Sequence, residues 1–405
     1  MPDEGIIFIS HQLEDCTMQP NVHITGSLKR SVLPAFALSA ALLFGCSQEK
    51  PVEPDLTSPD NAAINLDSMA ELEQLIAKHS EGEVSMEKKG RTVELPAGSH
   101  DGLAAAIAAA GKKGTVIVKA GLHTESQTVT ITREVRIIGE HGAILEFDTQ
   151  PWPPSAEIDP ALHIKKADDV VIWNVEIRPK GSIGGTAILV EDSEDAIIGR
   201  STIREHQFSV LLEGGDEAEI YKNTIIATTA WQTGNPAEVH GIVVINGKKV
   251  EIEKNDISNA LFGLWACDEK GEIERNTFHE NFIGLILCKV PDSAFPLPGG
   301  KLAGSALAAT EWKAEDNNAT GNFDAGYLVI DGANNNRLKN NKASNNGTYD
   351  FDLTGDTFRF GFLTPKSFEN KVIAGRYQNV RIKDCGENNT IIGGQLVDNS
   401  QDPCN

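Results

Sequence analysis

The sequence is short of basic residues and of aromatic rings. Lysine and arginine number 36 against 58 aspartate and glutamate residues, which gives a formal charge of −22, and aromatic residues make up 6% of the 405 positions. Such an acidic balance disfavours nucleic acid as a partner and repels polyanions at low salt. It therefore argues against a polyuronate ligand unless calcium bridges the two.

Metal-site spacing is also lacking. Six cysteines and ten histidines occur, and no Cys-x-x-Cys or His-x-x-His pair is among them. Structural zinc sites use short spacings of this kind. We therefore expect no cofactor; calcium is the alternative, with no site assigned to it.

The amino terminus holds one apolar run. Residues 28–30 start a positive segment, residues 31–44 are apolar but too short to span a bilayer, and Cys46 follows Leu-Phe-Gly. This stretch resembles a bacterial lipoprotein signal. The resemblance implies export, lipidation of Cys46 and a lipid anchor in the cell envelope, in the outer membrane if the source is Gram-negative. Plain secretion is the alternative, and a start at Met18 fits either.

A hexapeptide recurs through the chain and organises it. Each copy has an apolar first residue, a turn residue in fourth place and an apolar sixth residue. The copies span residues 198–203, 220–225, 252–257, 273–278 and 338–343. Apart from the last gap, the copies begin roughly 21 to 32 residues apart, a period that is typical of stacked repeats.

A second element, a small residue followed by an apolar-x-apolar triplet, accompanies the hexapeptide. Alternation with period two predicts strands with one buried face, and Gly, Asn and Asp supply the turns. These segments begin at Ala187, Ser209, Gly241, Gly263, Gly284 and Gly326. Two or three short strands cannot enclose a core alone, but stacked coils can, by pairing strands in parallel.

One turn position is shared by four asparagines, Asn223, Asn255, Asn276 and Asn341. Stacked amides can hydrogen-bond along a ladder at such a position. We predict this ladder because the flanking residues are apolar in every copy. Solvated turn asparagines are the alternative.

The start of the solenoid carries a family resemblance. An alanine-rich helix at residues 103–110, expected to cap the open end, is followed by strand patterns at 115–123, 129–131 and 135–139. This order resembles the opening of right-handed parallel β-helix proteins of the pectin lyase-like superfamily. The resemblance implies an all-β fold of about ten coils with an N-terminal capping helix. Residues 284–300 are also similar to an uncharacterised family of exported bacterial β-helix repeat proteins.

The predicted division of the chain follows from these patterns. The segments are 1–45, leader and signal peptide; 46–66, flexible acidic and proline-rich tether; 67–91, short helix and connector; 92–399, β-helix domain; and 400–405, tail. The helix is expected from Met69 to about His79, after a capping-box pattern.

Four cysteines remain in the exported domain. Cys267 and Cys288 occupy the same position in adjacent coils, within reach of a disulfide. Cys404 could join the tail to Cys385. Free thiols are the alternative for both pairs.

Three insertions, at residues 178–186, 226–240 and 290–311, border the outward face of one strand of each coil. The outward residues there form an apolar stripe of Leu189, Leu211, Val243, Trp265, Ile286 and Leu328. Such a stripe needs a cover or a partner. The favoured interpretation is that 290–311 folds over it. The alternatives are a ligand groove with tryptophans as sugar platforms, and a partner protein.

Polar candidates lie where the chain enters that strand. The candidate catalytic residues are Arg204, Glu205, His206 and His240. The candidate groove residues are Trp231, Trp265, His279 and Glu280. A histidine paired with a glutamate can act as general acid or base, whereas solvated turn histidines are the more ordinary interpretation.

Catalytic motifs of the superfamily are incomplete. Residues 187–200 are similar to the pectate lyase segment around its calcium site, but the acidic pair expected just upstream falls on Gly184 and Thr186. The sequence therefore predicts a cell-envelope protein whose β-helix presents a side groove to a polysaccharide or a partner protein. The alternative is a polysaccharide lyase or epimerase with a non-standard active site.

Overall fold

A computed structural model describes residues 66–79, 90–152, 155–228, 239–291, 294–359, 362–397 and 404. The predicted signal peptide, Cys46, the tether up to residue 65 and Trp231 lie outside the described residues. Among the described helices, none has the length and apolar character needed to cross a membrane.

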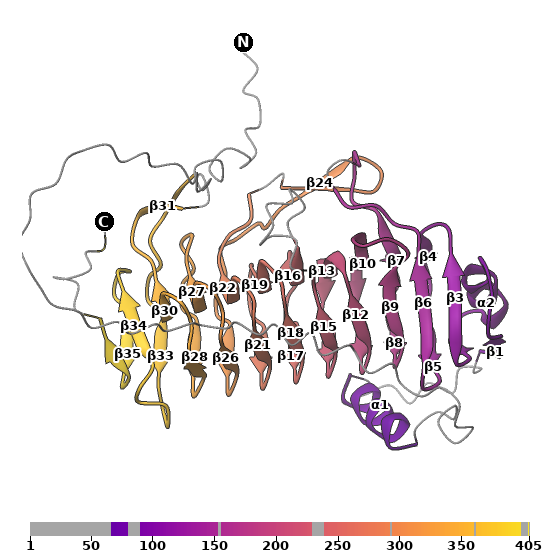
Figure 1. Ribbon diagram of the computed structural model, residues 1–405, viewed down its shortest axis with the longest axis horizontal. Coiled ribbons are helices and arrows are strands. Elements are labelled where there is room, and N and C mark those ends of the chain that lie inside the picture. Colours follow the sequence, from indigo (N-terminus) through magenta and orange to yellow (C-terminus); the bar gives the residue numbers. More distant parts are fainter. Residues whose placement is uncertain are drawn as a thin grey trace, which may run out of the picture. The chain divides into compact units, whose positions relative to one another are not determined.

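The described residues form three parallel sheets, A, B and C, which contain 12, 9 and 11 strands (Figure 1). The chain visits A, B and C in turn and then starts the next coil. Sheet A contains β1 (Thr92–Leu95), β2 (Gly114–Val118), β5 (Val135–Gly139), β8 (Val171–Trp173), β11 (Ile197–Gly199), β14 (Glu219–Tyr221), β17 (Glu251–Glu253), β20 (Glu272–Glu274), β25 (Lys313–Glu315), β28 (Arg337–Lys339), β33 (Lys371–Ile373) and β35 (Thr390–Ile392). Sheet B contains β3 (Gly121–Glu125), β6 (Ala143–Phe147), β9 (Glu176–Pro179), β12 (Thr202–Arg204), β15 (Thr224–Ile226), β18 (Asp256–Ser258), β21 (Thr277–His279), β26 (Asn318–Thr320) and β29 (Lys342–Ser344).

Sheet C contains β4 (Val129–Ile131), β7 (Pro160–Lys165), β10 (Gly184–Glu194), β13 (His206–Asp216), β16 (His240–Ile245), β19 (Phe262–Ala266), β22 (Ile283–Leu287), β27 (Ala325–Val329), β30 (Tyr349–Leu353), β34 (Arg381–Asp384) and β36 (Gln395–Leu396). Two hairpins, β23 (Phe295–Leu297) with β24 (Lys301–Ala303) and β31 (Thr357–Arg359) with β32 (Phe362–Thr364), are antiparallel. The predicted parallel β-helix is confirmed.

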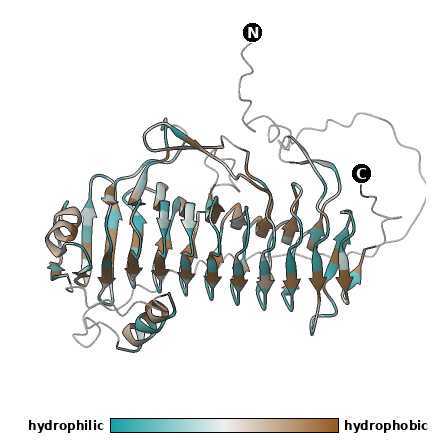
Figure 2. Cartoon of the chain, turned by 180° about the vertical axis from the view of Figure 1, so that it is seen from behind, coloured by the Kyte–Doolittle hydropathy of each residue, from teal (hydrophilic) through white to brown (hydrophobic). Residues whose placement is uncertain are grey.

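The hexapeptide repeats stack in register. Ile198 pairs with Ile220, Ile220 with Ile252, and Ile252 with Ile273 along sheet A. Each aliphatic side chain therefore covers the equivalent one in the next coil, and all four belong to one buried core. Apolar residues recur on strand after strand as a result (Figure 2).

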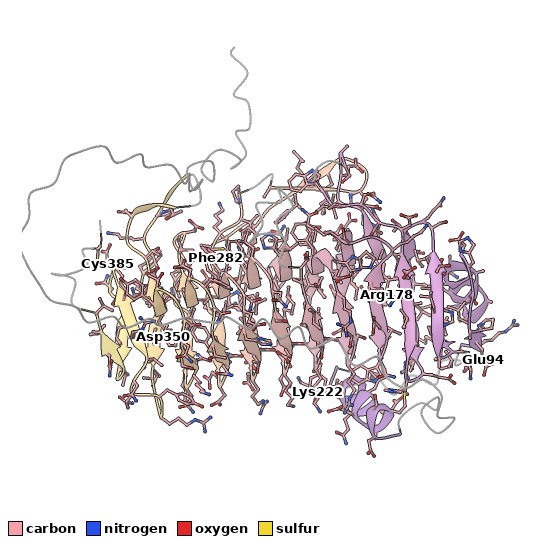
Figure 3. All side chains as sticks on the ribbon, in the orientation of Figure 1. Glu94, Arg178, Lys222, Phe282, Asp350 and Cys385 are labelled. Carbon is pink, nitrogen blue, oxygen red and sulfur yellow. A yellow bond between two sulfur atoms is a disulfide. The ribbon has the colours of Figure 1, made fainter. Side chains whose placement is uncertain are left out.

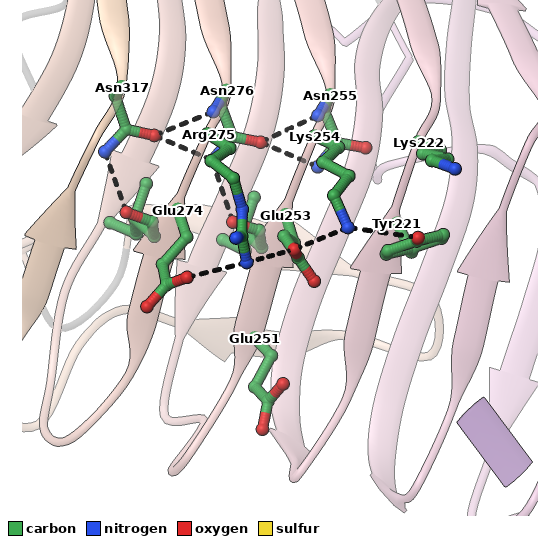
Figure 4. A network of polar contacts seen from close by, with 12 residues as sticks. Tyr221, Lys222, Glu251, Glu253, Lys254, Asn255, Glu274, Arg275, Asn276 and Asn317 are labelled. Atoms are coloured by element: carbon green, nitrogen blue, oxygen red, sulfur yellow. Dashed lines mark hydrogen bonds and ion pairs between the residues drawn. The ribbon is translucent and has the colours of Figure 1, made fainter. Parts of the chain in front are cut away.

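The predicted asparagine ladder is present at the corner between sheets A and B (Figure 4). Nδ2 of Asn223 donates to Oδ1 of Asn255, and Asn255 repeats the bond to Asn276, each at 3.0 Å. Asn317, which follows the 290–311 insertion and belongs to none of the predicted hexapeptide copies, lies between Asn276 and Asn341 in the ladder. Because these amides are buried, the ladder satisfies polar groups that water cannot reach.

The two other corners carry ladders of their own. One joins Asn281, Asn322 and Asn346, and the other joins Asn336, Asn370 and Asn389. Sequence reasoning missed both, although the same stacking of amides would have predicted them.

Helix α2 (Leu103–Ala110) caps the first coil at the position predicted for it. Leu103, Ala106, Ile107 and Ala110 are buried against the core. Oε1 of Glu125 accepts hydrogen bonds from the backbone N–H of Gly102 and of Leu103, at 3.0 and 2.9 Å. A carboxylate thus satisfies the free N–H groups at the start of the helix.

Helix α1 (Leu66–His79) begins three residues before the predicted Met69 and packs on the outer face of sheet A. Leu72 is buried with Trp173 and Tyr221, and Nε1 of Trp173 donates to Oγ of Ser68 at 2.7 Å. The sequence assigned no role to this helix. The structure shows that it shields apolar side chains on the outside of the solenoid.

Glu71 anchors α1 through three partners. Its carboxylate accepts hydrogen bonds from Arg200, Tyr221 and Lys222, and Lys222 lies beside the helix (Figure 3). Burial alone would raise the pKa of Glu71, but these hydrogen bonds outweigh it and lower the pKa from 4.5 to about 2. The docked helix therefore favours the ionised carboxylate.

We expect α1 docking to weaken as the pH falls. A carboxyl group whose pKa is lowered on docking contributes stability above pH 4.5 and loses it towards pH 2, an effect of at most about 3 kcal/mol. Glu71→Gln should remove this stabilisation of the docked helix at pH 7, so limited proteolysis should cut α1 at least about tenfold faster. Glu73→Gln on the same helix is the control: its carboxylate is exposed, and its ion pair with Arg136 should contribute no more than about 1 kcal/mol. Equal cleavage of both variants would contradict this role.

The two cysteine pairs differ in whether they form a disulfide. Cys385, near the C-terminal end of the coil stack (Figure 3), is joined to Cys404 by a disulfide. Cys267 and Cys288 are buried free thiols whose sulfur atoms lie 3.9 Å apart, so the disulfide considered for them is absent from the structure. They stack on neighbouring coils as predicted, but their Sγ atoms are not bonded.

Candidate functional site

The outer face of sheet C is covered. The predicted apolar stripe lies there, and five of its six residues are buried; Trp265 is half-buried. They form a second apolar cluster, outside the core, with Phe295 and Leu297 of the hairpin β23–β24 and with Ile158. The favoured interpretation, that the 290–311 insertion covers the stripe, is therefore confirmed. An open groove along it is not what the structure contains.

Two predicted catalytic residues lie beneath this cover. His206 and His240 begin the neighbouring strands β13 and β16 and are buried. The His240 ring packs against Phe208, Phe262 and Trp265, with centroids 5.2 to 5.4 Å apart. Burial lowers the pKa of His206 to about 3, so its ring is neutral at pH 7. Neither histidine is exposed to solvent in the structure.

Arg204 and Glu205 do not join the histidines. Arg204 ends β12 of sheet B and its guanidinium lies 3.4 Å from the carboxylate of Glu176. Glu205 has a left-handed backbone, φ 57°, at the turn from sheet B to sheet C. Because the chain turns there, Arg204 belongs to a different face from His206, and the predicted set of four is divided.

His279 and Glu280 are also separated from Trp265. His279 is on sheet B, where its Nε2 lies 3.0 Å from Oδ1 of Asp256 and its Nδ1 lies 3.7 Å from Glu280. The hydrogen bond with Asp256 raises the pKa of His279 despite partial burial. Of the predicted groove residues that the structure describes, Trp265 is on sheet C, His279 is on sheet B and Glu280 lies at the turn between β21 and β22.

An open polar cleft lies at the other end of the sheet C strands, where the chain turns towards sheet A. Its volume is about 460 Å³. It is lined by Lys166, Asp168, Asp192, Ser193, Glu194, Gly214, Asp216 and Asn246. The sequence pattern assigned Gly, Asn and Asp after each apolar triplet to turns, but the structure places Asp192 within β10 and Gly214 within β13. Their repetition was the signal for this cleft, because Asp192, Gly214 and Asn246 have left-handed backbones at equivalent positions of neighbouring coils.

A buried group of charges adjoins the cleft. Nε2 of His163 lies 2.8 Å from Oε2 of Glu191, and Nζ of Lys165 lies 3.2 Å from the same oxygen. Burial alone would raise the pKa of Glu191, but hydrogen bonds from His163 and Lys165 lower it. Burial lowers the pKa of His163 despite its carboxylate partner. Glu191 therefore stays ionised.

Lys301 connects the hairpin to the same charges. Its Nζ lies 2.6 Å from Oε2 of Glu213 and 3.7 Å from Oδ1 of Asp192, a cleft residue. Burial alone would lower the pKa of Lys301, but the hydrogen bond with Glu213 raises it. The ammonium group thus neutralises carboxylates beneath the hairpin.

No arrangement for a metal ion is evident in the described part of the chain, where no group of three or more His, Cys, Asp or Glu side chains is placed to hold one. The buried carboxylates Glu191 and Glu213 already have cationic partners in Lys165 and Lys301. The expectation of no cofactor is untested, and calcium stays its alternative without a site. The cleft lining offers charged, hydroxyl and amide groups for hydrogen bonding.

Comparison with known proteins gives the family. The model described as "Right handed beta helix region" matches residues 160–343 and 233–401, more than half of the chain. The chain belongs to this family. The predicted right-handed parallel β-helix is thereby confirmed. No curated protein matches the sequence.

Solved β-helix structures are similar in fold alone. The Dettilon tailspike protein gp208 has 16% identity and a TM-score of 0.45, over 75% of this chain and 68% of that one. The A-module of Azotobacter vinelandii mannuronan C-5 epimerase AlgE4 has 14% identity and a TM-score of 0.41, over 73% and 91%. The Streptococcus pneumoniae adhesin PfbA has 9% identity and a TM-score of 0.45, over 75% and 97%.

Proposed function

We propose that this β-helix protein is exported, lipid-anchored at Cys46 in the cell envelope, and binds a glycan in the polar cleft beside sheet C. The observation that carries the proposal is the cleft itself, an open space of about 460 Å³ lined by charged, hydroxyl and amide side chains. Rows of fixed donors and acceptors suit a ligand rich in hydroxyl groups. The lipoprotein-like signal at residues 28–46 supports the location.

Charge narrows the class of glycan. Asp168, Asp192, Glu194 and Asp216 line the cleft against Lys166. The whole chain also carries a formal charge of −22. Polyanionic chains are repelled by such a field. We therefore propose a neutral or amino-bearing polysaccharide, in preference to a polyuronate or a partner protein.

Affinity electrophoresis on neutral, amino-bearing and uronate polysaccharides tests this function. The wild type should be retarded by a neutral or an amino-bearing polymer. The double variant Asp192→Asn, Glu194→Gln keeps side-chain size but removes two cleft charges, so affinity for an amino-bearing polymer should fall about tenfold, or about 1.4 kcal/mol. Glu272→Gln, on the exposed face of sheet A, is the matched control.

Two outcomes would reject binding at the cleft. One is no retardation by any neutral or amino-bearing polymer, and the other is an equal loss in the Glu272→Gln control. Product analysis by mass spectrometry on the same samples addresses the enzymatic alternative. Unsaturated sugar products would indicate lyase activity, and epimerised products would indicate epimerase activity, in place of binding alone.

A further inference from the structure

The hairpin β23–β24 is structurally separate from the three sheets. Among the described strands, β23 and β24 pair only with each other. Its base is closed by backbone and side-chain hydrogen bonds between Val290 and Ser305. The hairpin can therefore move on its base without breaking a hydrogen bond of the solenoid sheets.

Packing and a few polar contacts hold the hairpin down. The Phe295 ring meets Phe208 and Trp265 edge to face, with centroids 5.4 and 5.9 Å apart. The backbone N–H of Ile158 donates to O of Pro296 at 2.7 Å. The N–H of Gly299 donates to Glu157 at 2.9 Å, and Lys301 bonds Glu213. These contacts form a latch around an apolar centre.

The floor beneath the hairpin is aromatic. Phe208, Phe262 and Trp265 surround His240, and Phe262 and Trp265 meet edge to face with centroids 5.3 Å apart. These rings come from β13, β16 and β19, three neighbouring strands. Aromatic faces of this kind stack well on the apolar face of a sugar ring.

Two polar side chains at the edge of this floor lack hydrogen-bond partners of good geometry. Thr186 pairs in register with Phe208 and so faces the same side of sheet C; its buried Oγ1 has no hydrogen-bond partner. His206, two residues before Phe208 on the same face, has the Gly185 backbone close by, but neither ring nitrogen makes a hydrogen bond of good geometry. A buried polar group left in this state is destabilising, because the hydrogen bonds that it made to water in the unfolded chain are not replaced.

We propose that residues 155–158 and the hairpin β23–β24 form a lid, and that opening it admits a pyranose ring onto the aromatic floor, where Thr186 and His206 bond its hydroxyl groups. The outer face of sheet C beneath the hairpin is then a ligand-binding site, and the structure shows it with the lid closed. The proposal rests on the proposed function for its ligand class, because the ring belongs to the glycan held in the cleft. Asp192 and Asn246 connect the two places: both line the cleft, Asp192 lies near Lys301, and Asn246 Nδ2 donates to O of Gly304 at 2.8 Å.

Lid opening is measurable without any ligand. Hydrogen exchange followed by mass spectrometry reports the amides of Ile158 and Gly299, which bond across the lid. Phe295→Ala and Lys301→Met, which remove the packing and the ionic part of the latch, should each speed this exchange at least about tenfold. Leu302→Ala, at a hairpin position that is 58% exposed, should leave it unchanged. The ladder amides of Asn255 and Asn276 should stay protected in all variants.

The lid is rejected if Ile158 and Gly299 exchange only together with the ladder amides in the wild type and in both latch variants. Two variants are used because one of them could misfold, which would appear as faster exchange of the ladder amides. The other variant then still tests the lid.

Oligosaccharide binding tests the aromatic floor as a ligand site. Cellohexaose, chitohexaose and xylohexaose are the probes, and tryptophan fluorescence gives their affinities. If the closed lid limits access, Phe295→Ala should bind at least one probe about tenfold more tightly than the wild type, because the competent state is no longer a minor population. Adding Trp265→Ala to that variant should remove the gain.

The outcomes separate this proposal from cleft binding. Equal affinities of the wild type and Phe295→Ala, with affinity still lost in the Asp192→Asn, Glu194→Gln variant, overturn the floor site and leave cleft binding intact. A gain in Phe295→Ala that the cleft variant does not diminish supports the floor and rejects the cleft. No binding of any probe to either protein overturns the floor.

Discussion

Asn255→Ala is expected to lower the free energy of unfolding by about 2–6 kcal/mol. Nδ2 of Asn255 donates to O of Ile220 and to Oδ1 of Asn276, while its Oδ1 accepts from N and Nδ2 of Asn223. Alanine would leave the backbone N–H of Asn223 and one of the two hydrogens on its Nδ2 buried without a partner, at about 1–3 kcal/mol each, while the other Nδ2 hydrogen still bonds O of Ile198. Denaturant unfolding followed by circular dichroism measures the loss.

Thr224→Ala is the matched control for this prediction. Thr224 follows the ladder residue Asn223 but its side chain is exposed on sheet B. Its replacement should change the unfolding free energy by no more than about 0.5 kcal/mol. A loss below about 1 kcal/mol in Asn255→Ala would show that the ladder is dispensable.

Trp312→Ala should cost about 3–5 kcal/mol, the usual loss for removing a buried aromatic side chain. The indole is buried in the core, and its Nε1 donates to O of Asp268 at 3.2 Å. It lies over Gly271 so closely that a Cβ there would clash with the ring. The ring therefore fills the space that a glycine of the preceding coil leaves open.

Thermal unfolding measures this second effect, with Phe323→Ala as control. Phe323 is also a large apolar residue of the same region but is 54% exposed. Its truncation should shift stability by less than about 0.5 kcal/mol. Equal shifts in the two variants would mean that Trp312 is not the packing element inferred here.

The corner asparagines show which contacts the local sequence pattern can predict. Asn223, Asn255 and Asn276 each stand fourth in a hexapeptide that has apolar first and sixth residues, so their stacking follows from the period alone. Asn317 was concealed because the 290–311 insertion breaks the period before it. The pattern is reliable where equivalent residues face equivalent neighbours, since each coil then repeats the contacts of the last.

The candidate site was only partly predictable for the same reason. Trp265 was predicted on the outward face of a strand and His206 where the chain enters one, and they lie in β19 and at the start of β13. Whether they meet solvent depends on residues far away in sequence. The contact between Gly299 and Glu157, for example, joins positions 142 residues apart. Likewise, nothing periodic in residues 66–79 places Glu71 beside Arg200 and Lys222.

The sequence by itself determined the solenoid, its buried rows, its first asparagine ladder and its capping helix, because each coil repeats one short pattern whose partners lie one period away. Only the tertiary structure decided which faces are covered, where the polar cleft opens and how α1 and the hairpin dock. Those features depend on single, non-repeated contacts between distant segments, and such contacts leave no period in the sequence.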